Sequence, residues 1–525
     1  MQVQVQDDVL PAQVEQSPLS AYSHVEEGSL GEDDRDQQLL ESIRHPWYWR
    51  LFHIAEGTAT IVDTDGRKTR RARSSANSLE HPIVASLVLQ FPWIGLSLLY
   101  FSVFELMTSY LTSRGVHYFV PRYMRAFLTF ALAPLVGAAS DRCTAKAGRR
   151  NHFLMLATLK LVISVMFLGG SLSIFGDHLF LLSINIAVII WGTVSMEVAV
   201  RARVFDEIPK EYQVHAHACG SIWHSVGVAL GMVLVGGGAK VVYGDQITED
   251  VMLFTCGIVV TAILVTVGVS MYLKPENMLY QERKHVVSVE RFFTEVWDVI
   301  TGAPMEIKLM CLLQLIVWMA WFALDNQKYK WWAETVFRGC PVLQSNATSA
   351  DGVGCDGHGV DLYMEGLDMA RHAVQGLSAV AFTSTLTFFW WIPRNPTGAS
   401  LKQVNLTYMT LGVVMLVVAV AVGSASHAVS FIAFVSLGGY FATVNILPFA
   451  MTGIIAKDFM DATDRFNNNG LYVGLLMQFS CCAKFAVENY NTTSISSLGS
   501  DNILALPLLL FVASTVFTYY NKYDV

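Results

Sequence analysis

Charged residues are scarce in this chain of 525 residues: Asp, Glu, Lys and Arg make up 15% of it, and hydrophobic residues 53%. A soluble protein would carry about 25% charged residues. The scarcity argues against a soluble protein and indicates a chain that crosses a membrane many times. The net charge of −8, with no basic surface patch in the sequence, also argues against a nucleic-acid partner.

Chemical motifs are missing as well. The sequence shows no metal-ligand spacing, phosphate-binding loop or nucleophile motif, so we expect no metal, no cofactor and no enzymatic activity. Residues 1–80 contain no apolar segment like that of a signal peptide. We expect these residues to form a cytosolic, mostly disordered tail.

Long apolar runs are what the chain does have. Twelve of them are long enough to cross a hydrocarbon core of about 30 Å. Their spans are 83–111, 119–139, 153–174, 179–202, 214–238, 251–273, 307–325, 372–392, 406–425, 428–455, 470–488 and 502–520. The pattern predicts an all-α membrane protein with an N-terminal half at 81–273, a cytosolic loop at 274–306 and a C-terminal half at 307–525.

The charged hairpin from Gly137 to Arg150 lies between the second and third runs. Lys146, Arg149 and Arg150 hold this loop on the cytosolic side, because cytosolic loops are rich in Lys and Arg. By the same rule, both chain termini are expected in the cytosol. An ordinary positive loop would account for the charge alone. The spacing of Asp141 and the cations also suits helix capping and ion pairs across the loop.

Ionisable residues inside a span are costly, so each suggests a function. Glu197 and Arg201 stand four residues apart in the fourth run and share one helix face. Burial raises a carboxyl pKa and a neighbouring arginine lowers it, so this pair could carry a switchable proton. A structural ion pair is the alternative. Glu105, late in the first run, is a second candidate for proton coupling.

The predicted external loops carry signs of an extracellular surface. Asn346 and Asn491 each begin a glycosylation sequon. Cys340 and Cys355 flank the first sequon and could form a disulfide on the oxidising side.

Several motifs occur in the order of one known family. The hairpin resembles the signature G-x-x-S-D-R-C-x-x-x-x-G-R-R of plant sucrose:proton symporters and their animal relatives, within the glycoside–pentoside–hexuronide:cation symporters of the major facilitator superfamily. Thr108–Gly115, Arg201–Asp206, Ala320–Phe322 and Asn469–Gly474 resemble further motifs of that family. Asp141, Arg142, Gly148, Arg149 and Arg150 match the hairpin signature, for which the resemblance implies gating.

The resemblance implies a twelve-helix major facilitator fold that moves a sugar with a proton by alternating access. It ties Arg201 to coupling and makes Glu197 the expected proton carrier. Lys330 and Lys484 depart from the family pattern, which has Asp and Gln there, so the identity of the sugar stays open. The alternatives are another solute or uncoupled transport on the same fold, and a sensor or scaffold that transports nothing.

Polar and aromatic residues within or beside the spans are candidates for binding the sugar. They are Gln90, Thr108, Tyr110, Trp318, Trp321, Asp325, Asp368 and Asn445. The two tryptophans could stack on a sugar face, although aromatic residues at helical spacing also serve packing. We expect a monomer in the lipid bilayer of the plasma membrane, with a sugar and a proton as its small-molecule partners.

Overall fold

The computed structural model describes residues 60–62, 68–70, 81–104, 110–111, 115–116, 119–143, 145, 148–176, 178–237, 249–276, 289–340, 357–392, 398–463, 468–494 and 503–520. The chain divides into two units, 1–53 and 54–525, and every described residue belongs to the second. Apart from two short antiparallel strands, β1 (Thr60–Val62) and β2 (Lys68–Arg70), the described secondary structure is helical.

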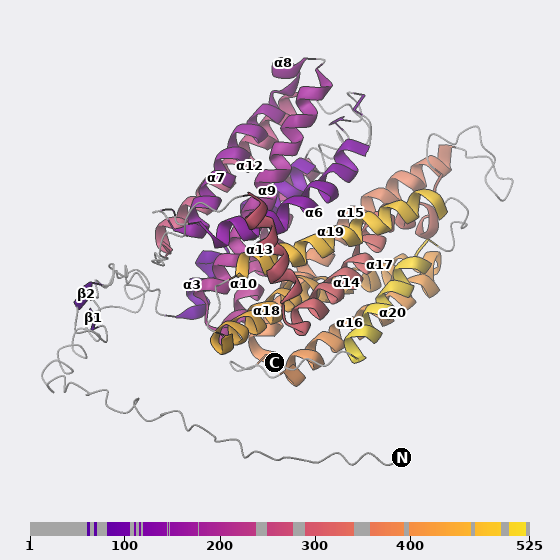
Figure 1. Ribbon diagram of the computed structural model, residues 1–525. Helices are drawn as coiled ribbons and strands as arrows, with labels where there is room; N and C mark the ends of the chain where they lie inside the picture. The colour runs from indigo at the N-terminus through magenta and orange to yellow at the C-terminus, as the bar shows by residue number, and fades with distance from the viewer. Residues whose placement is uncertain are drawn as a thin grey trace, which may run out of the picture. The chain divides into compact units, whose positions relative to one another are not determined.

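The helices that follow the strands build the N-terminal half (Figure 1). They are α3 (Pro82–Leu89), α4 (Trp93–Leu98), the π-helix η1 (Leu99–Val103), α6 (Phe119–Asp141), α7 (Arg149–Gly169), α8 (Ser171–Phe175), α9 (Leu179–Glu207), η2 (Lys210–Tyr212), α10 (Gln213–Gly237) and α12 (Glu249–Leu273). Helix α7 packs between α9 and α12, and α10 packs on α4. Pro92 separates α3 from α4, because proline lacks the N–H that would continue the helix.

After α13 (Val289–Thr301), the C-terminal half repeats this pattern. Its helices are α14 (Met305–Lys330), the π-helix η3 (Trp331–Val336), α15 (Gly357–Trp391), α16 (Gly398–Val422), η5 (Gly423–Ala425), α17 (His427–Ser436), α18 (Gly438–Thr463), α19 (Asn469–Ser494) and α20 (Ala505–Tyr520). Helix α14 packs against α18, α19 and α20. Stacking of Tyr440 on Phe511, with centroids 4.1 Å apart, is part of this apolar core.

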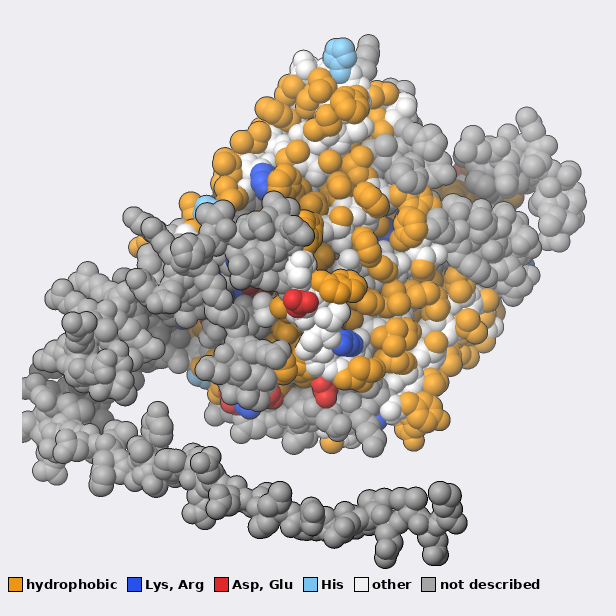
Figure 2. Space-filling model, viewed as in Figure 1, with side chains coloured by type: hydrophobic (Ala, Val, Ile, Leu, Met, Phe, Trp, Pro, Cys, Tyr) orange, Lys and Arg blue, Asp and Glu red, His pale blue; other side chains and the backbone are white. Residues whose placement is uncertain are grey.

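Ten helices of the described residues are long and apolar enough to cross a membrane. The two remaining predicted runs correspond to α15, which falls outside that group, and to α20, which is shorter. The count of twelve spans therefore stays a prediction. Large apolar side chains such as Phe180 and Trp390 are 77% and 90% exposed. Figure 2 shows hydrophobic side chains over most of the described surface in view, as lipid contact requires.

Two expectations from the sequence are wrong in detail. Pro134 and Pro448 lie in the second and tenth predicted runs, where proline predicts an interruption, but both lie inside continuous helices, α6 and α18. The predicted loop at 326–371 is largely helical, because η3 continues α14 to Val336 and α15 begins at Gly357. Charged side chains at the ends of these helices made the apolar runs in the sequence shorter than the helices themselves. The central loop contains an amphipathic helix, α13.

The two halves meet along three pairs of helices. Helix α6 packs on α19, and α10 packs on α15 and α18. Gly137 and Gly474 allow the close approach of α6 and α19, since a Cβ on either would lie within 2.4 Å of a carbonyl oxygen across the interface. Functional side chains on these helices therefore lie between the halves.

Candidate functional site

The central cluster is built around Glu197 of α9. Its Oε1 accepts a hydrogen bond from Arg201 Nε at 3.2 Å, and its Oε2 accepts one from the Tyr100 hydroxyl at 3.1 Å. The Arg201 guanidinium lies 4.6 Å from the ring centroid of Trp93 and 3.7 Å from that of Phe449. The cluster thus joins α9 to α4 and η1 of its own half and to α18 of the other half.

The Glu197–Arg201 pair is shielded from solvent and carries no net charge as it stands. Glu197 and Arg201 neutralise each other, and their side chains are only 16% and 7% exposed. A proton on Glu197 would remove the negative charge that pairs with Arg201. The Arg201 guanidinium would then be held by the rings of Trp93 and Phe449. Tyr100 belongs to the π-helical turn η1, and such turns occur frequently at functional sites.

Arg125 of α6 also belongs to this region, and the sequence analysis missed it. Its guanidinium lies 4.2 Å from the ring centroid of Tyr100 and 5.1 Å from that of Phe104. An arginine inside the predicted run 119–139 was a visible signal. Lys484 of α19, with its Nζ 5.9 Å from the ring centroid of Phe322, lies close enough to interact with Arg125.

The two predicted tryptophans lie near this cluster, on α14. Trp318 packs on Phe322 with ring centroids 5.0 Å apart, and Trp321 packs on Phe441 of α18 at 4.5 Å. The indole N–H of Trp318 is buried without a hydrogen-bond partner among the described residues. The amide of Asn445 donates to the Phe441 carbonyl at 3.0 Å. A ligand hydroxyl could satisfy the Trp318 N–H.

The other predicted ligand-binding residues are more scattered. Gln90 is buried, and its amide donates to the Ala216 carbonyl at 3.4 Å. The Tyr110 hydroxyl shares a hydrogen bond of 2.8 Å with that of Ser171. These contacts lie within the N-terminal half. Glu105 and Thr108 lie outside the described residues.

Two predicted acidic residues lie nearer to solvent or lipid. Asp325 accepts a hydrogen bond from Lys328 at 2.5 Å and is 40% exposed. Asp368 is 62% exposed and pairs with Arg371 at 3.7 Å. Local ion pairs therefore occupy both carboxylates.

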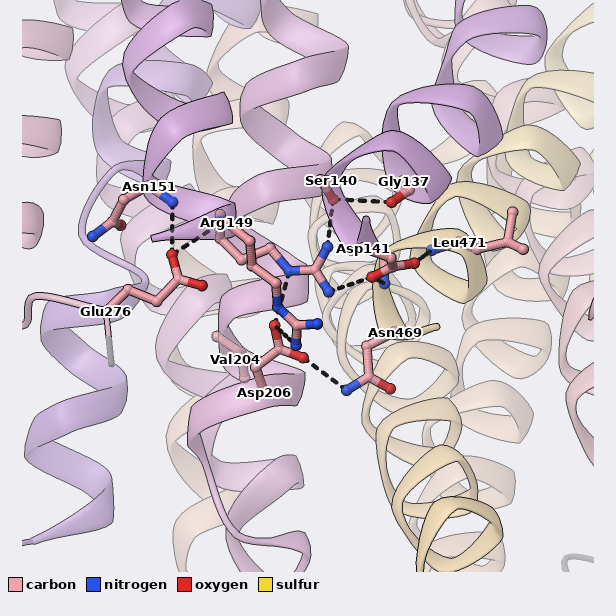
Figure 3. A network of polar contacts seen from close by, with 12 residues as sticks. Gly137, Ser140, Asp141, Arg149, Asn151, Val204, Asp206, Glu276, Asn469 and Leu471 are labelled. Carbon is pink, nitrogen blue, oxygen red and sulfur yellow. Dashed lines mark hydrogen bonds and ion pairs between the residues drawn. The ribbon is translucent and has the colours of Figure 1, made fainter. Parts of the chain in front are cut away.

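The hairpin residues form a second site, the loop cluster of Asp141, Arg149, Arg150, Asp206 and Asn469 (Figure 3). Arg150 reaches Asp141 at 2.5 Å and Asp206 at 2.8 Å, and Arg149 reaches Asp206 at 2.9 Å. The Asn469 amide donates to Asp206 at 2.9 Å. These contacts join α6, α7 and α9 of one half to α19 of the other.

Asp141 makes the direct contact with the N-terminus of α19. Its carboxylate accepts the backbone N–H groups of Gly470 and Leu471, each at 2.9 Å. A carboxylate at a helix N-terminus is favoured by the unpaired N–H groups and by the helix dipole. A Cβ on Gly470 would lie 2.6 Å from the backbone carbonyl oxygen of Gly137, so glycine is needed here. The halves are closed against each other at this end.

The remaining hairpin residues shape the loop itself. Arg142 donates to the Ala138 carbonyl at 3.1 Å, which caps the end of α6. Gly148 has φ of 96°, in the left-handed region. A Cβ on Gly148 would also lie 2.5 Å from Glu276 Oε2.

Glu276, just past the end of α12, closes the loop cluster from the other side. Its Oε2 accepts the backbone N–H groups of Arg150 and Asn151 at 2.8 Å and 2.9 Å. Burial raises the pKa of this carboxyl, and the bond from Asn151 only partly opposes the rise. Glu276 thereby connects the loop cluster to the start of the predicted central loop.

The predicted external features are described only in part. Cys340 forms a disulfide, and its expected partner Cys355 lies outside the described residues, as does Asn346. Asn491 falls in the last turn of α19 rather than in the loop that the sequence suggested.

Comparison with known proteins gives partial sequence matches, and no protein-family model matches. The chain is 24% identical over 209 residues to the general alpha-glucoside permease of Schizosaccharomyces pombe, covering 36% of this chain and 37% of the permease. It is 23% identical over 250 residues to sucrose transport protein SUT5 of Oryza sativa, covering 42% of this chain and 46% of that protein.

A third match is to solute carrier family 45 member 4 of Mus musculus, 30% identical over 135 residues, covering 23% of this chain and 17% of that protein. The chain thus spans less than half the length of these relatives. Their names confirm the predicted resemblance to the sucrose:proton symporters and their animal relatives.

Solved structures match over most of the chain. The fucose:proton symporter of E. coli matches with a TM-score of 0.55 at 13% identity, covering 84% of this chain and 98% of that one. A proton:xylose symporter matches with a TM-score of 0.52 at 12% identity, covering 83% and 94%. This likeness shows the fold, which is the major facilitator fold, as predicted. The ten described helices of membrane length and apolar composition are those of an integral, multi-pass membrane protein.

Proposed function

We propose that this protein carries a sugar together with a proton, by alternating access between its two six-helix halves. The observation that supports this most is the central cluster, a half-buried carboxylate and a buried arginine between the halves on α9, with Phe449 of α18 against the guanidinium. The partial sequence matches to a glucoside permease and a sucrose transport protein favour a sugar as the solute.

Glu197 carries the proton in this mechanism. When Glu197 is ionised, it holds Arg201 on α9. When it is protonated, Arg201 loses its strongest partner and turns to the ligand or to the aromatic faces of Trp93 and Phe449. Proton loading and sugar binding are coupled because both change the partners of Arg201. At a membrane potential of 100 mV, one proton supplies about 2.3 kcal/mol.

The loop cluster acts as the gate at the end that we assign to the cytosol. In the closed state, Asp141 holds the N-terminus of α19 while Arg150 holds Asp141. Opening this end requires Asp141 to leave the amide groups of Gly470 and Leu471. Rocking of one half against the other then exposes the central cluster to the opposite side. We assign both termini to the cytosol and the protein, as a monomer, to the plasma membrane.

Counterflow of labelled sugars into proteoliposomes tests this function. Vesicles preloaded with an unlabelled sugar should accumulate the same labelled sugar. Adding that sugar outside empty vesicles should raise the external pH. Counterflow without a pH change would show an uncoupled facilitator, and no counterflow over a broad panel of sugars would refute sugar transport.

A further inference from the structure

His224 of α10 lies at the same depth as the central cluster. Helices α9 and α10 are joined by η2 at one end of the bundle, and α10 packs on α4 and on α18 of the other half. Glu197 stands ten residues before the end of α9, and His224 stands eleven residues after the start of α10. At a rise of about 1.5 Å per residue, both side chains lie about 15–17 Å from that end.

The His224 ring is held on one edge and open on the other. Its Nδ1 shares a hydrogen bond of 2.6 Å with the Ser97 hydroxyl of α4. Its ring centroid lies 5.8 Å from that of Trp93 and 5.7 Å from that of Phe441 of α18. The other ring nitrogen, Nε2, makes no hydrogen bond within the described part of the chain. Because the side chain is half-buried and Nε2 is not enclosed, this nitrogen is open to a ligand.

Either tautomer of His224 suits a hydroxyl group. If Ser97 donates to Nδ1, then Nε2 carries the proton and donates; if Nδ1 donates to Ser97, then Nε2 accepts. A hydroxyl group can both donate and accept, so it meets both cases. A cationic ligand is disfavoured, because Arg201 shares the Trp93 ring with His224 and its positive charge acts on this region.

The other half adds a matching surface beside His224. The Phe441 ring, which packs on His224, also packs on Trp321 of α14 with centroids 4.5 Å apart. Asn445, one turn along α18, donates its amide to the Phe441 carbonyl, and its amide oxygen makes no hydrogen bond with the described residues. Phe441 and Asn445 are both half-buried. Aromatic faces with a few polar atoms beside them are typical of small-molecule sites, and here the polar atoms come from both halves.

We propose that His224 is a specificity-determining residue of the solute site, whose Nε2 forms a hydrogen bond with one hydroxyl group of the sugar. Ser97 is a positioning residue, because its bond to Nδ1 fixes the plane of the ring. This inference rests on the proposed sugar transport and adds to it a residue that distinguishes one position on the sugar.

Competition by mono-deoxy analogues tests the inference in proteoliposomes that contain the full-length protein. Each analogue lacks one hydroxyl group of the sugar that the counterflow panel has identified, and each competes for uptake of that labelled sugar. In the wild type, the analogue that lacks the hydroxyl bound by His224 should compete about tenfold more weakly than the parent sugar, because its binding leaves Nε2 unpaired.

Two substitutions of His224 separate recognition from packing. An asparagine amide takes the place of Nδ1 and can keep the bond to Ser97, whereas a glutamine amide reaches the place of Nε2. His224→Asn should weaken binding of the parent sugar about tenfold and change that of the analogue by less than about twofold, so that the two compete equally. His224→Gln should restore most of the preference, and Ser97→Ala should reduce it to about threefold.

His372→Asn is the matched control. His372 of α15 also uses Nδ1 for a hydrogen bond, to the Asp368 carbonyl at 2.9 Å, but its side chain is 60% exposed. This variant should keep the preference of the wild type for the parent sugar.

Three results would overturn the inference while sugar transport stands. The first is that His224→Asn weakens the parent sugar and every analogue by the same factor, as a packing role would. The second is that no analogue competes more weakly than the parent in the wild type, or that the preference survives in His224→Asn. The third is that both His224 variants bind the parent sugar normally but no longer raise the external pH, which would make His224 a proton carrier. A protein that exchanges no sugar at all would instead refute the proposed function itself.

Discussion

The loop cluster and the central cluster both place arginine beside a carboxylate, but they satisfy these groups to different degrees. In the loop cluster, Asp141 has Arg150 and two backbone N–H groups, and Asp206 has two arginines and Asn469. In the central cluster, Arg201 has one carboxylate and two aromatic rings. The several donors on each carboxylate of the loop cluster hold one arrangement of the halves, whereas the single ion pair of the central cluster can exchange partners with a ligand and a proton.

Removal of Arg201 from the central cluster should reduce uptake more than any change to the loop cluster. In Arg201→Ala, the half-buried Glu197 keeps Tyr100 as a hydrogen-bond donor but loses its ion pair, and removing one partner of a buried ion pair costs about 3–5 kcal/mol. Uptake should fall by about a hundredfold or more. Uptake of labelled sugar, normalised to the amount of protein in the membrane, measures the loss. Lys160→Gln is the control, because Lys160 is also a cation inside a span but rests on the ring of Trp191, and it should retain near wild-type uptake. An Arg201→Ala protein with half of the normal uptake would contradict the role of this pair.

Disruption of the loop cluster should separate transport from binding. Asp141→Asn weakens the contacts to Arg150 and to the N-terminus of α19, so the closed state loses stability. We expect uptake to fall about tenfold and binding of labelled sugar to the purified protein to stay within about twofold, because the charged hydrogen bonds lost are worth about 1.5–3 kcal/mol.

Asp458→Asn is the control for that experiment. Its partner Lys210 lies 2.6 Å away in the other half, but the two side chains are 44% and 47% exposed. An exposed ion pair contributes about 0–1 kcal/mol, so uptake should change little. Equal losses in both variants would mean that the loop cluster has no special part in gating.

Removal of the Tyr100 hydroxyl should have a smaller effect on the central cluster. Tyr100→Phe keeps the ring under Arg125 but takes one hydrogen bond from Glu197. One hydrogen bond contributes about 0.5–1.5 kcal/mol, so uptake should fall by about threefold. Uptake of labelled sugar, normalised to the amount of protein in the membrane, measures the loss. Uptake equal to that of the wild type would remove Tyr100 from the coupling mechanism.

Glu276→Gln should have the smallest effect, and it should change the thermal stability of the protein rather than uptake. Its pKa is raised by burial, so its contribution is fully present below the unfolded-state pKa of about 4.3 and is lost as pH rises through the higher folded-state value. The melting temperature of the wild type, relative to Glu276→Gln, should therefore increase as pH falls from 8 towards 5. A difference that grows with rising pH would contradict the burial of this carboxyl.

The sequence predicted the features that repeat over long stretches. Apolar runs of membrane length predicted the long helices, and ordered motifs predicted the family resemblance and the fold. The cytosolic side of the loops stays a prediction. The Glu197–Arg201 contact was also predictable, because residues four apart on a helix must share a face.

Contacts between distant segments were not predictable in the same way. The contact between Asp141 and Leu471 depends on how α6 and α19 pack against each other. A single sequence does not reveal which faces of two distant helices meet. Arg125 was overlooked because its significance comes from Tyr100 and Lys484, which belong to other helices. The helices around η3 and α15 were underestimated because charged residues within them resemble a loop.

Proton movement in Glu197→Gln proteoliposomes tests the central claim most directly. We predict that the wild type raises the external pH when sugar is added, and that Glu197→Gln still exchanges labelled sugar in counterflow but moves no protons. Sugar-induced alkalinisation of the same size in Glu197→Gln would show that the proton travels by another route and would contradict the role of the central cluster.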